Sequence, residues 1–98
     1  MQIAADTETN QLLDQISVAL CESYTQAEAE SLVRDYYVKF TDPFYCRSIG
    51  VPVQDDDFFF HEGVRGMALR VHYYLGLEGD PAPSKFIEWR ATARGQRA

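Results

Sequence analysis

The chain lacks the features of a membrane protein or a disulfide-built scaffold. None of its apolar runs approaches the roughly 20 residues that a membrane-spanning helix needs, and residues 1–11 are polar, without the basic start and apolar core of a secretory signal. Only two cysteines, Cys21 and Cys46, occur in 98 residues. We therefore expect a cytosolic protein with reduced thiols, in which Cys21 is buried and no Cys21–Cys46 disulfide is implied.

Positive charge is scarce in the first half of the chain. Residues 1–57 carry 11 acidic and 3 basic side chains, a net charge of −8, whereas residues 58–98 carry 4 acidic and 6 basic ones, a net charge of +2. A nucleic-acid surface needs lysine and arginine against the phosphates, so nucleic acid is not expected as a partner of the acidic half. The same charge permits a basic protein partner.

Motifs that would identify an enzyme are also missing. Glycines 63 and 66 lack the preceding strand and the Lys-Ser/Thr pair of a phosphate-binding loop, and no Gly-x-Ser-x-Gly nucleophile elbow occurs. The sequence His61-Glu62 resembles the start of a zinc-protease helix, but Arg65 occupies the position of the second histidine. We therefore predict no catalytic residues, no metal and no cofactor.

What the chain does contain is aromatic side chains in a helical pattern. Six Tyr, six Phe and one Trp indicate a core built largely from rings. The length favours one domain over residues 1–98, with residues 1–8 and 94–98 frayed at the ends. The predicted fold class is mainly α: an N-terminal helical hairpin, a long central helix and a short C-terminal helix, with a minor extended segment near 51–54.

The hairpin is predicted from apolar spacing and capping residues. Apolar side chains from Leu12 to Leu20 recur at three- and four-residue steps after Thr9, the expected N-cap of the first helix. Thr25-Gln-Ala-Glu28 fits a capping box, and the stripe that follows it ends near Phe40. Few residues separate the two patterns, so the helices should pack antiparallel.

The second half is predicted to hold two further helices. Asp42-Pro43 ends the hairpin, a short helix should stop at Gly50, and Val51-Pro52-Val53 should be extended, as a β-bridge or an edge strand. A third long helix should begin at Asp57 or a neighbouring Asp, and Ser84 should cap the last helix. The buried face of the third helix is predicted to hold Phe60, Val64, Met67, Ala68, Val71 and Leu75.

The densest chemistry lies in residues 54–62, Gln-Asp-Asp-Asp-Phe-Phe-Phe-His-Glu. Three adjacent carboxylates and three adjacent rings are typical of a helix start, a ligand pocket or a partner surface. If the segment is an unbroken helix, Asp57 and His61 share a face, and Arg65 follows one turn later. The candidate ligand- or partner-binding residues are Asp55, Asp56, Asp57, Phe59, His61, Glu62 and Arg65.

These observations favour a small acidic cytosolic interaction or accessory module without enzymatic activity, most simply a homodimer. Three alternatives stay open. An inhibitor or immunity-type protein would present its acidic half to a basic partner, and a small-ligand-binding protein would use an aromatic pocket near Phe59 and His61. A metal-dependent or acid–base enzyme would bring Asp57, His61 and Glu62 within ~3–4 Å of a common point.

Overall fold

The computed structural model describes the backbone of residues 1–95 and the side chains of residues 1–93, and it confirms the mainly α fold. No strand forms within these residues, and the connection over residues 51–55 makes no β-bridge. Five α-helices and one π-helical turn follow one another. They are α1 (Thr7–Leu20), α2 (Gln26–Phe40), α3 (Pro43–Ile49), α4 (Asp56–Val71), η1 (His72–Gly76) and α5 (Pro83–Gly95).

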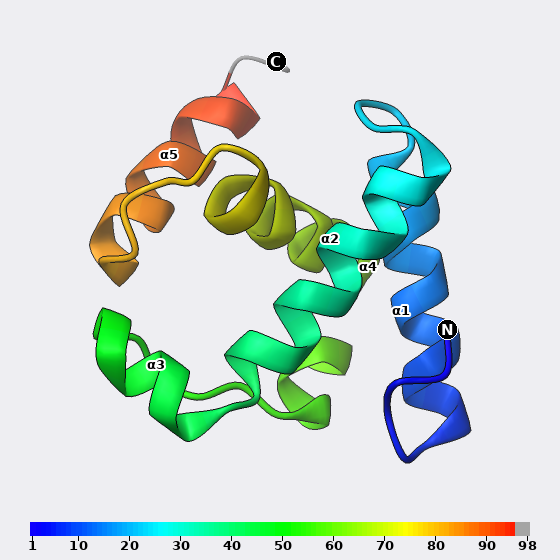
Figure 1. Ribbon diagram of the computed structural model, residues 1–98. Coiled ribbons are helices and arrows are strands. Elements are labelled where there is room, and N and C mark those ends of the chain that lie inside the picture. Colours follow the sequence, from blue (N-terminus) through cyan, green and yellow to red (C-terminus); the bar gives the residue numbers. More distant parts are fainter. Residues whose placement is uncertain (96–98) are drawn as a thin grey trace.

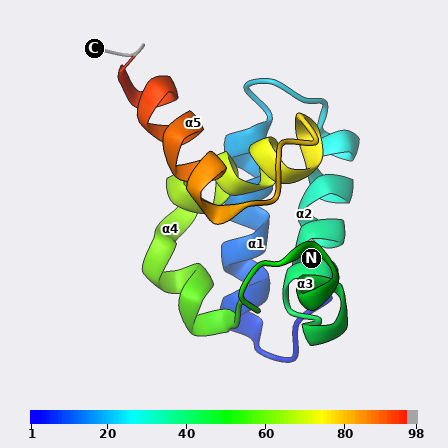
Figure 2. The same cartoon turned by 90° about the vertical axis from the view of Figure 1, so that its left-hand side faces the viewer.

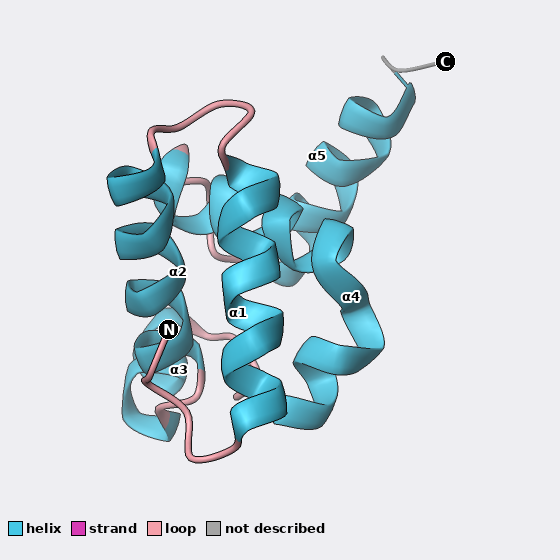
Figure 3. Ribbon diagram, turned by 90° about the vertical axis from the view of Figure 1, so that its right-hand side faces the viewer, coloured by secondary structure: helices cyan, strands magenta, loops and turns pink. Residues whose placement is uncertain are grey.

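The helix α1 lies between α2 and α4, and all three contribute to the core. Figure 3 shows α1 flanked by these two helices, with α1 and α2 running antiparallel as the hairpin prediction required. Helix α3 lies beyond the end of α2, on one side of the molecule (Figure 1). Helix α5 points away from the layer that α1, α2 and α4 form (Figure 2). The fold therefore leaves α5 attached mainly through its first turns.

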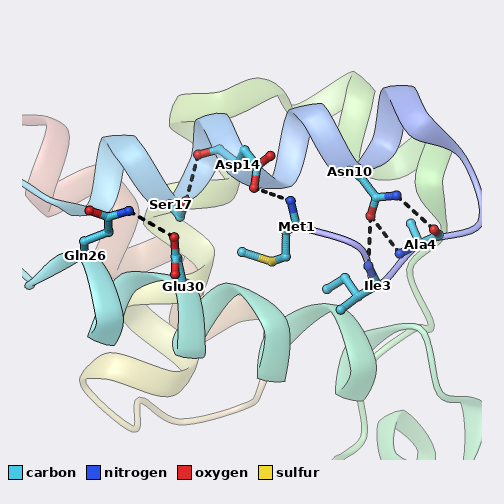
Figure 4. A network of polar contacts seen from close by, with 8 residues as sticks. All are labelled: Met1, Ile3, Ala4, Asn10, Asp14, Ser17, Gln26 and Glu30. Atoms are coloured by element: carbon cyan, nitrogen blue, oxygen red, sulfur yellow. Dashed lines mark hydrogen bonds and ion pairs between the residues drawn. The ribbon is translucent and has the colours of Figure 1, made fainter.

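The N-terminal segment folds back onto α1, which begins earlier than predicted. Asp6 is the N-cap, and its side chain accepts a hydrogen bond from the Glu8 amide. The prediction that Thr9 caps this helix is wrong, because Thr9 is a fully buried residue within it. The Asn10 side chain accepts hydrogen bonds from the amides of residues 3 and 4 and donates one to the Ala4 carbonyl, at 2.8–3.0 Å (Figure 4). These bonds tie the segment before Asp6 to the first turns of α1.

The capping box of α2 is confirmed in both directions. The Thr25 hydroxyl accepts from the Glu28 amide at 3.2 Å, and the Glu28 carboxylate accepts from the Thr25 amide at 2.9 Å. The break at Asp42-Pro43 is also confirmed, because Asp42 caps α3 and proline occupies its first turn. Helix α3 ends at Gly50, as predicted.

Stacked rings join the helices at the centre of the fold. Tyr36 and Phe40 on α2 stack with their centroids 4.1 Å apart. Phe59 of α4 meets the edge of Tyr36 at 5.9 Å, and Tyr74 of η1 lies 5.1 Å from Phe40. Aromatic pairs in these geometries stabilise a core beyond the area that they bury. The expectation of a ring-built core is thus met, and its buried rings come from α2, α4, η1 and, through Phe86, α5.

Helix α4 is not continuous, which changes the predicted faces. Gly63 has φ 80° and ψ 176°, and the helix bends there, as Figure 2 shows. The prediction that Phe60 lies on the buried face is wrong: its side chain is 45% exposed, whereas its neighbour Phe59 is only 1% exposed. Residues on the two sides of Gly63 do not share one helical phase, so the four-residue step from His61 to Arg65 does not align their side chains.

We expect Gly63→Ala to lower the free energy of unfolding by about 1–3 kcal/mol, because only glycine adopts this backbone conformation readily. In an unbroken helix the same change would raise stability by about 1 kcal/mol. A side-chain carbon added at Gly63 meets no other atoms, so the backbone conformation alone decides whether the free energy of unfolding falls or rises. Urea denaturation measures the change, with Gln15→Ala on the exposed face of α1 as the control. A Gly63→Ala protein more stable than the wild type would contradict the kink.

Two further local predictions need correction, and one lies largely outside the described residues. Cys21 is exposed at the end of α1, so the expectation of a buried Cys21 is wrong, while Cys46 is buried and both thiols are unpaired. Ser84 does not cap α5, because Pro83 already lies in that helix. Of the predicted frayed tail over residues 94–98, the last three residues lie outside the described chain.

Candidate functional site

The three adjacent aspartates at the start of α4 have different surroundings. Asp55 is the N-cap of α4 and accepts a hydrogen bond from the Phe58 amide at 2.8 Å. Asp57 is exposed, and its carboxylate makes no hydrogen bond to the described residues. Both carboxylates lie near the positive end of the helix dipole, which stabilises them there. The helix start suggested by the sequence therefore accounts for two of the seven candidate residues.

Asp56 joins three helices. One carboxylate oxygen accepts from the Tyr37 hydroxyl at 2.8 Å and the other from the Thr9 hydroxyl at 3.0 Å. Burial, the hydrogen bond to Asp56 and the charge of Asp56 together raise the pKa of Tyr37 to about 12. Asp56 thus binds α1 and α2 to the start of α4, and both of its oxygens are occupied by the fold.

Glu62 forms an ionic cluster that fastens α5 to α4. Its carboxylate lies 2.9 Å from the Arg70 guanidinium and 3.9 Å from that of Arg90 on α5. The side chains of Glu62 and Arg70 are 17% and 15% exposed. The guanidinium of Arg70 also lies between the rings of Phe58 and Phe86, with centroid distances of 4.9 and 4.6 Å. These contacts hold the first turns of α5 against the kinked helix.

The remaining candidates do not converge on a reaction centre. Phe59 belongs to the core, and His61 and Arg65 are exposed. Neither Phe59 nor His61 lines any of the principal cavities between the described residues. No group of three or more His, Cys, Asp or Glu side chains within those residues is arranged to hold a metal ion. The predicted segment is thus divided between caps, core contacts and an exposed edge.

A second histidine, His72, makes a more specific contact than His61. His72 Nδ1 and the Tyr24 hydroxyl are joined by a hydrogen bond of 2.6 Å. Burial lowers the pKa of His72 and raises that of Tyr24, so both groups are neutral at pH 7. Gly76 permits this contact, because a side-chain carbon there would collide with the Tyr24 hydroxyl. This pair fastens the turn between α1 and α2 to η1.

Two hollows that share Leu32 and Leu75 form a groove between α2 and η1. One part of about 400 Å³ lies between α2, α3 and the connection to α5, and another of about 450 Å³ continues along α2 past Leu32 and Leu75, which line both. We call the two together the α2–η1 groove. Its lining consists of Tyr24, Ala27, Glu28, Ser31, Leu32, Asp35, Lys39, Phe40, Tyr45, Ile49, Tyr74, Leu75, Gly76, Glu78, Gly79 and Pro81.

The groove lining mixes apolar side chains, among them Leu32 and Leu75, with more acidic than basic ones. Its charged lining residues are Glu28, Asp35 and Glu78 against Lys39 alone, a net charge of −2. The connection that forms one edge leads directly into α5, whose Ile87 is 55% exposed. The sequence does not predict this groove, because its two walls are distant in the chain and one of them is a π-helical turn, which has no simple periodic signature.

Comparison with known proteins adds no assignment: neither a family, nor a curated protein, nor a solved structure matches the chain. Within the described residues, no helix has the length and apolar character needed to cross a membrane. The features of the fold that bear on function are the groove, the polar contacts around α4 and the side chains that α5 exposes.

Proposed function

We propose that the protein is a non-enzymatic interaction module that acts as a cytosolic homodimer, with α5 of each copy seated in the α2–η1 groove of the other. The observation that carries this proposal is a groove with leucines and a net negative charge in its lining, placed next to a basic helix with an exposed isoleucine. Cytosolic location accords with the two unpaired cysteines.

Charge complementarity supports a second copy as the occupant. Apart from Arg90, which contacts Glu62, the charged residues of α5 are Lys85 and Arg94 against Glu88, a net charge of +1. The groove carries a net charge of −2 on its lining residues. Opposite potentials across an interface guide association and set its register, and their effect weakens as salt rises.

The position of the two surfaces supports a symmetric arrangement. The connection over residues 77–82 forms an edge of the groove and then enters α5, so both surfaces belong to neighbouring parts of one copy. A two-fold axis lets each copy give α5 and receive α5 in the same contact. Ile87 then supplies the apolar anchor, and Leu32 and Leu75 supply its counterpart on the floor of the groove.

We expect sedimentation equilibrium at micromolar concentration to give twice the chain mass of 11.2 kDa. Ile87→Glu should weaken the dimer by about 10- to 100-fold, since it places a charge where an apolar side chain was buried. Val18→Glu makes the same change at a valine of α1 that is 71% exposed and lies outside the groove, and it should leave the dimer intact.

Two outcomes would contradict this function. A wild-type chain that sediments as a monomer up to hundreds of micromolar would exclude the homodimer. Equal weakening by Ile87→Glu and Val18→Glu would exclude α5 as the inserted segment. If the monomer instead binds a lysine-rich amphipathic peptide and its groove resonances shift, the occupant is a basic segment of another protein, as the inhibitor-type alternative requires.

A further inference from the structure

A separate cavity of about 220 Å³ lies where residues 51–54 pass α4, η1 and the start of α5. Most of its walls are apolar: Val51, Pro52, Val53, Phe58 and Pro83. The volume is many times that of one water molecule and smaller than a typical drug-sized site. Its polar lining residues are Gln54, Arg70 and Tyr74.

The positive charge beside this cavity is not fully balanced. Arg70 and Arg90 share the single carboxylate of Glu62. The Nε atom of Arg70 is buried and has no hydrogen-bond partner among the described residues. A buried guanidinium N–H without an acceptor is unfavourable, because it has lost its hydration without compensation. Because Nε is closed even to water, it is not itself a donor to a ligand, but the cluster has one positive charge in excess beside the cavity.

The other two polar side chains also offer donors. Gln54 is only 9% exposed, and its side-chain oxygen already accepts from the buried Tyr36 hydroxyl at 2.9 Å. Its amide NH₂ group makes no hydrogen bond to the described residues, and neither does the hydroxyl of Tyr74. Burial raises the pKa of Tyr74, so this hydroxyl keeps its proton at pH 7. Gln54 and Tyr74 thus offer donors without acceptors among the described residues, and Arg70 adds a positive charge.

We propose that this cavity binds a small organic monocarboxylate. The carboxylate lies beside the Arg70 guanidinium and accepts from the Tyr74 or Gln54 donors, while a short apolar chain lies against Val51, Phe58 and Pro83. Opposite charges attract more strongly at such a partly buried position than in bulk water. The proposal goes beyond the interaction function, and it does not depend on the α5 contact between copies.

The test uses butyrate as the probe and butyramide as its uncharged counterpart, each added to the full-length ¹⁵N-labelled protein. We expect butyrate at millimolar concentration to shift the Arg70 Nε–Hε resonance, which is assigned by its loss in Arg70→Lys. Tyr74→Phe should weaken butyrate binding about three- to tenfold, the effect of one hydrogen bond. Tyr45→Phe, at a tyrosine that does not line this cavity, should leave binding unchanged.

Three results would overturn the proposal. One is an Arg70 resonance that butyrate does not shift, which would show that butyrate does not bind in the cavity. Another is equal binding of butyrate and butyramide, since that would remove the role of charge. The third is unchanged affinity in both Tyr74→Phe and Arg70→Lys. Ile87→Glu separates this site from the dimer, because Ile87 does not line the cavity: this variant should bind butyrate as the wild type does.

Discussion

Replacing Phe59 with alanine is expected to lower the free energy of unfolding by about 3–5 kcal/mol, the usual loss for a buried phenylalanine. The ring is 1% exposed and meets the edges of Tyr36 and Tyr37 at centroid distances of 5.9 and 5.5 Å. Its removal leaves a cavity where α2 and α4 meet. Since domains of this size are stable by only about 5–15 kcal/mol, this one change removes a large part of the total. Urea denaturation followed by circular dichroism measures it.

The neighbouring residue provides the control. Phe60→Ala makes the same chemical change at a ring that is 45% exposed, and we expect a loss of at most about 1 kcal/mol. Which of the two variants loses more stability distinguishes the kinked helix from the unbroken helix that the sequence predicts, in which Phe60 faces the core. A larger loss for Phe60→Ala than for Phe59→Ala would contradict the described packing of α4.

The second large effect is expected at Glu62. Glu62→Ala should lower the free energy of unfolding by about 2–3 kcal/mol, because it leaves the guanidinium of Arg70 largely buried without its carboxylate partner. The expected value lies below that of a fully buried ion pair, since both side chains keep some contact with solvent. Hydrogen exchange should also speed up in the first turns of α5, which the cluster fastens to α4.

Glu88→Ala is the matched control, because it breaks an ion pair of exposed side chains on α5. Glu88 and Lys85 are 3.7 Å apart, with side chains that are 68% and 55% exposed. We expect a change within about 0.5 kcal/mol. Similar losses in the two variants, or unchanged exchange of α5 in Glu62→Ala, would show that the Glu62 cluster does not hold this helix.

Features that depend on neighbouring residues were predictable from the sequence. The capping box at Thr25 and Glu28 uses atoms three residues apart, so composition and spacing determine it. The break at Asp42-Pro43 follows from the proline ring in the same way. The ring-rich core was also predictable, because the aromatic side chains recur at helical spacing along α2.

Features that depend on distant contacts were not predictable. The positive φ of Gly63 ends the helical phase, but the sequence around it has the apolar spacing of one long helix. Asp56 was identified as a candidate, yet its partners Thr9 and Tyr37 are 47 and 19 residues away in the chain. Nothing local distinguishes a carboxylate that holds helices together from one that binds a ligand. The same applies to the pair of Tyr24 and His72, 48 residues apart.

The most direct test of the proposed dimer is an isotope-filtered NOE measurement on a mixture of ¹³C-labelled and unlabelled copies. Only contacts between copies give signals in such a sample. The account predicts intermolecular NOEs from the Ile87 methyl groups to those of Leu32 and Leu75. The complete absence of these NOEs in a sample that sediments as a dimer would contradict the insertion of α5 into the α2–η1 groove.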